Sequence, residues 1–170
     1  VRQQALPLSG DAGISDIGDM IRRDVIPAPT SRGALTEGEL LDDYIGHVLS
    51  FIDPSVIRPL RLVLDAGSGM AGLVGPAIYD RLPCQTTRLC FEVDGTFPNH
   101  QANPLLEENR RDLVEQVQAE KADAGIAWDG DADRCFFVDS DAEFVAGDFI
   151  TALLAEAFLR KEPGAKVVYD

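Results

Sequence analysis

Between residues 61 and 160, short apolar segments alternate with segments of helical periodicity, which is the pattern of an α/β domain. Strands are predicted at residues 61–65, 87–92, 124–128 and 135–138, and helices at residues 73–79, from Pro104 onward and at 148–160. The segment 129–134 is too short for a helical crossover, so the strands on either side of it must be antiparallel neighbours. We therefore predict an α/β fold in one compact domain, with a mostly parallel mixed sheet and helices on both faces.

Three of the predicted helices begin at residues suited to helix capping. Ser15 is expected to cap a short helix that contains Ile17, Met20 and Ile21. Thr36 and Glu39 fit a capping box, and the helix that it opens should bury Leu41, Ile45, Val48 and Ile52. Asn103 as the cap and Pro104 at the first helical position should open a helix that buries Leu106, Leu113 and Val117.

The segment between the last two predicted strands carries three alternating carboxylates, Asp129, Asp131 and Asp133. Three negative charges this close repel one another unless a cation offsets them, and Mg²⁺ prefers oxygen ligands of this kind. Arg134 follows directly, and a guanidinium is well suited to bidentate binding of phosphate. The pattern indicates a metal loop that serves phosphoryl chemistry.

Three other interpretations of this loop can be weighed. An EF-hand needs Gly at its sixth position and Glu at its twelfth, where this chain has Arg134 and Ser140. A phosphatase with an aspartyl nucleophile usually has Thr or Val where Asp133 stands. A solvated acidic turn stays open as the third, because Asp and Gly form turns in any protein.

A glycine-rich turn follows the first predicted strand. Gly67, Gly69 and Gly72 give the spacing of a dinucleotide-binding turn, and Glu92 lies about 20 residues on, where an acidic residue would hold a ribose. A nicotinamide-dinucleotide-binding module is therefore the main alternative function. Against it, the charge of Asp65 would face the pyrophosphate, and glycines also serve tight packing. Spacing alone does not separate the two interpretations.

The two histidines are expected to be structural or hydrogen-bonding residues. His100 lies in a segment rich in turn formers, residues 97–104, and His47 lies on a predicted helix. The net charge of −14 argues against a nucleic-acid partner. No apolar run is long enough for a membrane helix, so no membrane partner is expected. Three cysteines without paired spacing indicate free thiols and a cytoplasmic location: Cys84, Cys90 and Cys135.

Three segments, residues 65–72, 97–108 and 125–134, follow one another in the order seen in α-D-phosphohexomutases, and together they resemble the bacterial phosphomannomutase/phosphoglucomutases. The resemblance runs through residues 36–165, and its most specific motif is Asp-Gly-Asp-Ala-Asp-Arg at 129–134. It implies a four-domain enzyme. Residues 1–35 would be the tail of the first domain, 36–165 the second domain, and 166–170 the opening strand of the third.

The resemblance also implies roles for residues. Asp129, Asp131 and Asp133 would bind Mg²⁺ together with a phosphoserine of the first domain, and Arg134 would hold the active-site phosphate. The glycine turn would be a packing turn. The serine loop of the family is absent from this chain, so the chain alone is expected to be inactive.

The implied activity is that of an isomerase. Hexose 1-phosphate and hexose 6-phosphate, of mannose or glucose, would interconvert through a phosphoserine and a hexose 1,6-bisphosphate. The expected partners are these sugar phosphates and the remaining domains of the same protein. Residues that would choose between mannose and glucose lie in domains that this chain does not include.

Overall fold

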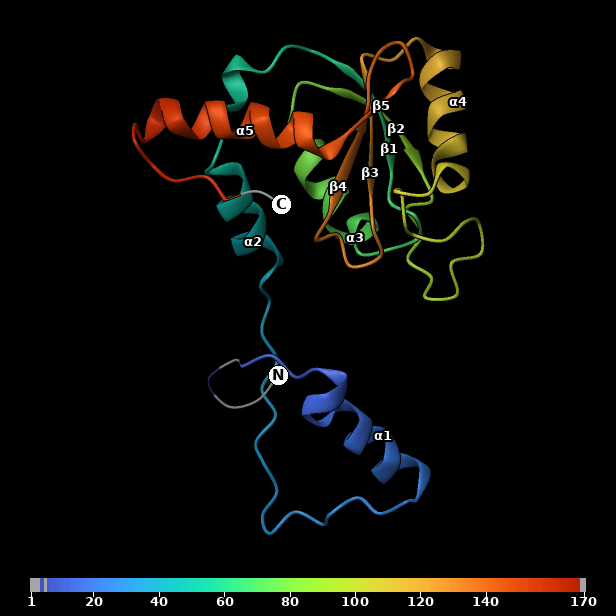
Figure 1. Ribbon diagram of the computed structural model, residues 1–170, viewed down its shortest axis with the longest axis vertical. Coiled ribbons are helices and arrows are strands. Elements are labelled where there is room, and N and C mark those ends of the chain that lie inside the picture. The colour runs from blue at the N-terminus through green and yellow to red at the C-terminus, as the bar shows by residue number, and fades with distance from the viewer. Residues whose placement is uncertain (1–3, 5, 169–170) are drawn as a thin grey trace. The chain divides into compact units, whose positions relative to one another are not determined.

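The computed structural model describes Gln4 and residues 6–168, and it divides into two units, Val1–Gly38 and Glu39–Asp170 (Figure 1). In the first unit, the short π-helix η2 (Gly10–Ile14) runs directly into α1 (Ser15–Arg22). The prediction that Ser15 caps this helix is wrong. Ser15 is its first residue, and its backbone N–H already donates to the carbonyl of Gly10, so no free helix end remains there to cap.

The second unit is built on a five-stranded mixed sheet in the order β2-β1-β3-β4-β5 (Figure 1). β1 lies between β2 and β3 and is parallel to both, whereas β4 pairs antiparallel with β3 and with β5. The strands are β1 (Arg61–Asp65), β2 (Gln85–Leu89), β3 (Ala124–Trp128), β4 (Cys135–Val138) and β5 (Phe144–Val145). The predicted mixed sheet and the antiparallel pair are confirmed.

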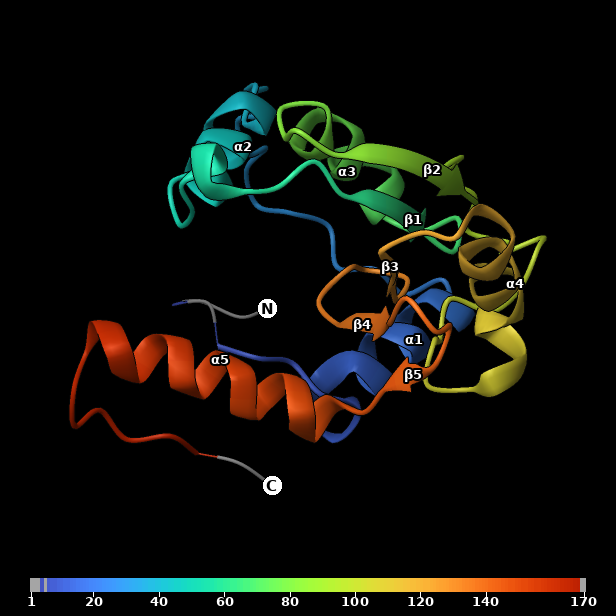
Figure 2. The same ribbon diagram turned by 90° about the horizontal axis from the view of Figure 1, so that it is seen from above.

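Alternate residues of the strands pack on opposite faces of the sheet, as the two-residue period of a strand requires. One face carries Val63 and Ala127 against α4 (Arg111–Glu120), which contributes Leu113 and Val117. The other face carries Leu62, Leu64 and Ile126, packed against Tyr79 at the end of α3 (Ala71–Tyr79). The helices therefore cover both faces, as predicted (Figure 2).

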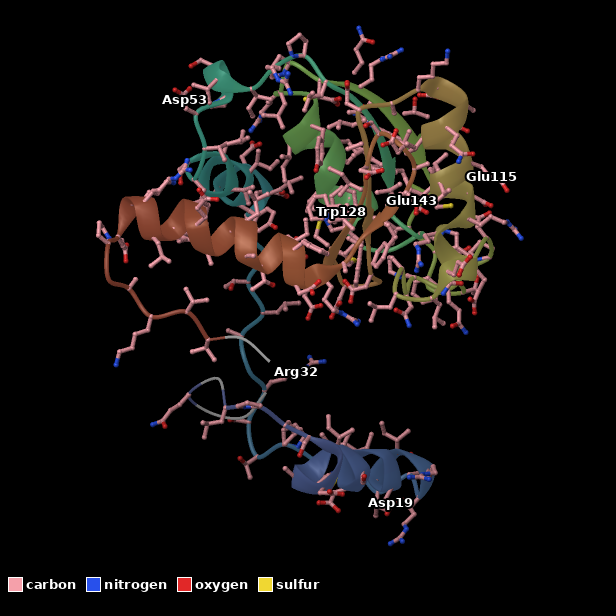
Figure 3. The ribbon with its side chains drawn as sticks, turned by 45° about the horizontal axis from the view of Figure 1, so that its top comes forward. Asp19, Arg32, Asp53, Glu115, Trp128 and Glu143 are labelled. Carbon is pink, nitrogen blue, oxygen red and sulfur yellow. The ribbon has the colours of Figure 1, made fainter. Side chains whose placement is uncertain are left out.

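Trp128, the last residue of β3, lies between the sheet and α3 (Figure 3). Its ring meets the ring of Tyr79 edge to face, with the centroids 5.9 Å apart. Such aromatic pairs contribute about 0.5–1.5 kcal/mol beyond their buried area. The contact holds the end of the strand immediately before Asp129. The loop of residues 129–134, called the acidic loop below, begins at this point.

The remaining helices are α2 (Leu41–Leu49), η3 (Pro54–Val56), η4 (Glu107–Arg110) and α5 (Gly147–Lys161). The prediction of a capping box at Thr36 and Glu39 is wrong, because α2 begins only after Leu40 and has no side-chain cap. Of the four residues predicted to be buried by this helix, only Ile45 lies in the core, while Leu41 and Ile52 are exposed. Helix α5 follows β5 and extends beyond the sheet (Figure 2).

Two other predicted boundaries are wrong for local reasons. The second strand ends at Leu89, because Cys90 adopts a φ of +54° that no extended strand can contain. The helix predicted from Pro104 begins only with η4, because the guanidinium of Arg110 donates to the carbonyls of Pro104 and Leu105 and holds this segment as a turn. The prediction that this helix buries Leu106 is wrong, since Leu106 is exposed, whereas Leu113 and Val117 are buried as predicted.

The predicted strand at 166–170 does not form over residues 166–168, and residues 169–170 lie outside the described part of the chain. No helix among the described residues has the length and apolar character to cross a membrane.

Candidate metal centre

The acidic loop joins β3 to β4 and leaves the sheet at the carboxyl end of β3. Asp129 is buried, while Asp131 and Asp133 are exposed to solvent. One oxygen atom from each of these three carboxylates lies within 4.8 Å of the others. The structure therefore brings together the three predicted ligands at one point, and all of their donor atoms are oxygens.

Arg134 closes the loop on Asp129. The backbone N–H of Arg134 donates to Oδ1 of Asp129 over 3.0 Å, and its Nε and Nη2 lie 2.8 and 2.6 Å from Oδ2. Burial raises the pKa of Asp129, but the hydrogen bonds and the positive charge of Arg134 outweigh it and hold the pKa below its usual value. Asp129 is thus kept as a carboxylate. The side chain of Arg134 stays more than half exposed, so it also faces solvent.

The loop is curled tightly by its small residues. Ala132 adopts a φ of +62°, and its N–H donates to the carbonyl of Asp129 over 3.1 Å. Asp129 itself donates a longer backbone bond, 3.4 Å, to the carbonyl of Arg134. In an extended segment these alternate residues would share one face but stand about 6–7 Å apart along it. The curl instead draws one oxygen of each carboxylate to within 4.8 Å of the others.

The glycine turn packs against this loop and against the end of β2. A Cβ atom added at Gly69 would lie 2.6 Å from the carbonyl oxygen of Gly130, and one at Gly72 would lie 2.3 Å from that of Phe91. The N–H of Met70 donates to the carbonyl of Gly130 over 3.0 Å. Backbone therefore fills the space next to Gly69 and Gly72 that a dinucleotide-binding turn would offer to a pyrophosphate.

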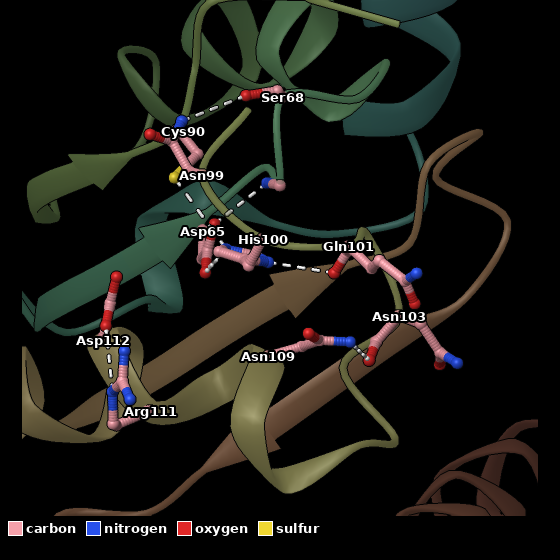
Figure 4. Close-up of polar contacts among 11 residues, drawn as sticks. Asp65, Ser68, Cys90, Asn99, His100, Gln101, Asn103, Asn109, Arg111 and Asp112 are labelled. Atoms are coloured by element: carbon pink, nitrogen blue, oxygen red, sulfur yellow. Dashed lines mark hydrogen bonds and ion pairs between the residues drawn. The ribbon is translucent and has the colours of Figure 1, made fainter. Parts of the chain in front are cut away.

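A second cluster of polar side chains lies at the ends of β1 and β2 (Figure 4). Nε2 of His100 lies 3.0 Å from Oδ2 of Asp65 and 3.8 Å from Sγ of Cys90. Asp65 is buried, and Cys90 and His100 are partly buried. His100 therefore has a hydrogen-bonding role, as expected, but the sequence analysis did not connect it with Asp65 or Cys90.

Strand register offers a signal for this grouping. Asp65 is paired with Leu89 across the two parallel strands, so Cys90 follows one residue beyond the same sheet edge. Carboxyl ends of adjacent parallel strands meet at one edge, which is where ligand sites of such sheets form. The other histidine, His47, packs edge-on against Phe51, with centroids 4.9 Å apart, and has no part in either cluster.

The acidic loop fits Mg²⁺ by its chemistry. Mg²⁺ takes oxygen ligands from carboxylates and keeps positions for phosphate oxygen or water. The three grouped carboxylates match that donor set. Fold and site together define an α/β domain with an oxygen-donor loop at the carboxyl end of a central strand.

Comparison with known proteins gives the family. Residues 42–142 match the family model described as phosphoglucomutase/phosphomannomutase, alpha/beta/alpha domain II. The chain is 44% identical over 170 residues to a protein of Xanthomonas campestris pv. campestris (strain B100) named "Phosphohexose mutases", covering 100% of this chain and 38% of that protein. It is 42% identical over 178 residues to a phosphomannomutase of Escherichia coli, covering 100% of this chain and 39% of that protein.

Solved structures agree with this assignment. The crystal structure of a phosphoglucomutase/phosphomannomutase family protein from Burkholderia thailandensis matches with a TM-score of 0.77 and 33% identity, over 93% of this chain and 33% of that one. The chain belongs to the phosphoglucomutase/phosphomannomutase family, which confirms the resemblance noted from its motifs. It spans about two fifths of the length of the curated relatives that it matches. The nicotinamide alternative finds no support in these comparisons.

Proposed function

We propose that this chain supplies the metal loop of a phosphomannomutase/phosphoglucomutase, an isomerase that interconverts hexose 1-phosphate and hexose 6-phosphate. The reaction would pass through a phosphoserine and a hexose 1,6-bisphosphate, with mannose or glucose phosphates as substrates. The observation that carries the proposal is the convergence of three carboxylate oxygens within 4.8 Å on a loop that ends in Arg134.

Asp129, Asp131 and Asp133 would hold Mg²⁺, which when bound supplies positive charge that polarises a phosphoryl group. Asp129 is the fixed member of the three. Its carboxylate is buried and oriented by the backbone and side chain of Arg134, yet a carboxylate has about four acceptor positions and keeps some of them for a cation. Asp131 and Asp133 are exposed and can adjust to the ion.

Arg134 would have two functions. Nε and Nη2 of its guanidinium bind Asp129, which keeps that carboxylate charged and in place. A guanidinium has five N–H donors, and the exposed part of this side chain leaves the others free to bind a phosphate oxygen. An Arg in this position can therefore position the metal ligand and the transferred group at the same time.

For the domain organisation, we propose that residues 1–35 are the tail of the first domain and 36–165 the second domain. Residues 166–170 would be the first strand of the third domain, although residues 166–168 form no strand in the structure of this chain. The greater length of the relatives supports this proposal. So does the apolar surface of α5, where Phe149, Leu153 and Phe158 are each more than 60% exposed, as expected of a helix that further domains cover. Three free cysteines support a cytoplasmic location.

A coupled mutase assay on the full-length protein tests the proposal, using mannose 1-phosphate and glucose 1-phosphate with and without Mg²⁺. We expect Mg²⁺-dependent conversion that falls at least about 100-fold in kcat in Asp131→Asn, because loss of a ligand to the ion removes several kcal/mol of charge stabilisation. Asp141→Asn is the matched control, since Asp141 is an exposed carboxylate in the next loop, and it should leave the rate unchanged.

The isolated 170-residue chain should show no conversion above background. Conversion that is unaffected by Mg²⁺ removal, or that survives in Asp131→Asn, would contradict the assigned role of the acidic loop.

A further inference from the structure

We propose that Asp65, Cys90 and His100 form a second metal site, distinct from the acidic loop and suited to Zn²⁺. These residues come from three separate segments: the last position of β1, the residue after β2, and the loop of residues 97–103 (Figure 4). The proposal does not depend on the proposed mutase function.

The spacing of the donor atoms fits a tetrahedral ion. Zn²⁺ binds sulfur at about 2.3 Å and nitrogen or oxygen at about 2.0–2.2 Å, so tetrahedral ligand atoms lie about 3.3–3.6 Å apart. The distance from Nε2 of His100 to Oδ2 of Asp65 is 3.0 Å, and the distance to Sγ of Cys90 is 3.8 Å. These two distances bracket the tetrahedral value. The three protein ligands would leave a fourth position for water.

The donor set selects for Zn²⁺ over Mg²⁺. A thiolate, an imidazole and a carboxylate are ligands of a borderline-soft ion, whereas Mg²⁺ requires oxygen ligands. The acidic loop offers only carboxylate oxygens. The two clusters therefore differ in the ions that they prefer, and one protein could hold both ions without direct competition.

Two of the three residues make hydrogen bonds to backbone groups outside the cluster, as metal ligands commonly do. Nδ1 of His100 lies 2.9 Å from the carbonyl oxygen of Gln101, so an N–H at Nδ1 donates to that carbonyl and Nε2 faces the cluster. Oδ1 of Asp65 accepts the N–H of Gly67 over 2.9 Å, which leaves Oδ2 directed at His100. Both ligands are thus already oriented by a backbone group on their far side.

Cys90 is held in a costly conformation that places its thiol in the cluster. Its φ of +54° lies in the left-handed region, which residues with a side chain rarely adopt and which is concentrated at functional sites. Burial, together with the negative charge of Asp65, raises the pKa of Cys90 to about 11, so the thiol is protonated when no ion is bound. An ion would displace the thiol proton on binding.

An ion at this position would stabilise the segments that pack against the acidic loop. It would tie the ends of two neighbouring parallel strands to the loop of residues 97–103. That loop packs against the glycine turn and the acidic loop, because a Cβ at Gly67 would lie 3.1 Å from Cβ of Ala102 and one at Gly130 would lie 3.4 Å from the ring of Phe97.

Competition titration with Zn²⁺ tests the site in the full-length protein. The protein is first stripped with a chelator, and Zn²⁺ is then added in the presence of millimolar Mg²⁺ and a chromophoric competitor. We expect one Zn²⁺ per chain that persists in Asp131→Asn. Its affinity should fall at least about 100-fold in Cys90→Ser and in His100→Gln, because the loss of even an outer partner costs about 10–100-fold. Cys135→Ser is the matched control and should bind as the unmodified protein does.

Substitution of Co²⁺ for Zn²⁺ gives a second measurement, which is made on the unmodified protein and needs no variant of a proposed ligand. A cobalt–thiolate charge-transfer band should appear in the unmodified protein and in Cys135→Ser, because the acidic loop contains no sulfur. The absence of that band, Zn²⁺ affinity unchanged in Cys90→Ser, or complete loss of Zn²⁺ binding in Asp131→Asn would each overturn the proposal.

Discussion

The two polar clusters of this domain are built in opposite ways. The acidic loop takes its three carboxylates from five consecutive positions, and two of the three are exposed. The cluster of Asp65, Cys90 and His100 takes one residue from each of three segments, and Asp65 is only 2% exposed. The first is local and solvated, and the second exists only after the sheet has formed.

This difference predicts how each cluster is coupled to the fold. Exposed carboxylates repel one another and contribute little to stability, so the acidic loop can be dedicated to binding. A buried carboxylate must have its hydrogen-bond partners, because an unsatisfied buried polar group costs free energy. The cluster of Asp65, Cys90 and His100 should therefore affect stability strongly, whereas the exposed carboxylates of the acidic loop, Asp131 and Asp133, should affect it only weakly.

The largest expected contrast is between Asp65→Ala and Asp131→Ala. Removing the carboxylate of Asp65 leaves the N–H of Gly67 and the Nε2 of His100 without their acceptor, so we expect the free energy of unfolding to fall by about 3 kcal/mol. Asp131→Ala should change it by no more than about 0.5 kcal/mol. Urea unfolding followed by the fluorescence of Trp128, the only tryptophan, measures both values.

Equal losses in these two variants would show that the exposed loop is as tightly coupled to the fold as the buried cluster, and would remove the distinction. Asp141→Ala, in an exposed turn outside both clusters, serves as the reference for loss of one surface carboxylate.

Two glycine substitutions should affect ion binding at the two clusters differently. A Cβ at Gly69 would press on the acidic loop at Gly130, whereas a Cβ at Gly72 would press on Phe91, next to Cys90. Each alanine variant should lose about 1–3 kcal/mol of stability. Gly69→Ala should weaken Mg²⁺ binding more than Zn²⁺ binding, and Gly72→Ala should do the reverse. Isothermal titration calorimetry with each ion measures this crossed effect.

Gly46→Ala is the control for these variants. Gly46 lies in α2 with nothing within 4 Å of an added Cβ, so alanine should stabilise the helix by about 0.5–1 kcal/mol. Equal losses of Mg²⁺ and Zn²⁺ affinity in Gly69→Ala and in Gly72→Ala would contradict this prediction. They would mean that either substitution displaces the whole glycine turn and disturbs both clusters.

The sequence predicted those parts of the structure that depend on neighbouring residues. The strands Arg61–Asp65, Ala124–Trp128 and Cys135–Val138 were predicted at their observed bounds, because short apolar runs between turn formers carry a local signal. The grouping of Asp129, Asp131 and Asp133 was predictable for the same reason, since alternate positions on a curled loop converge.

The errors arose where side-chain hydrogen bonds and backbone conformation override the local propensity. Asn103 and Pro104 are good helix starters, yet the guanidinium of Arg110 takes the carbonyls of Pro104 and Leu105. The composition of residues 90–92 favours a strand, but the φ of +54° at Cys90 ends the strand before it. The buried cluster could not be assembled from spacing, because its members are neighbours only through the register of β1 and β2.

The smallest expected effect is an opposite pH dependence of two asparagine variants. Burial raises the pKa of Asp65 in the folded state, so its contribution to stability is greatest below its ordinary pKa of about 3.9 and is lost as pH rises through the raised value. Arg134 outweighs burial at Asp129 and lowers its pKa, so that contribution is present above about 3.9 and is lost as pH falls through the lowered value.

As pH falls from 7 to about 3.5, the stability advantage of the unmodified chain should therefore grow over Asp65→Asn and shrink over Asp129→Asn. Urea unfolding across this range measures both slopes. Asp112 also acts on Asp65, so Asp112→Asn is run in parallel to separate the charge of Asp112 from the burial of Asp65. Slopes of the same sign would mean that solvation, and not the ion pair with Arg134, governs both carboxylates.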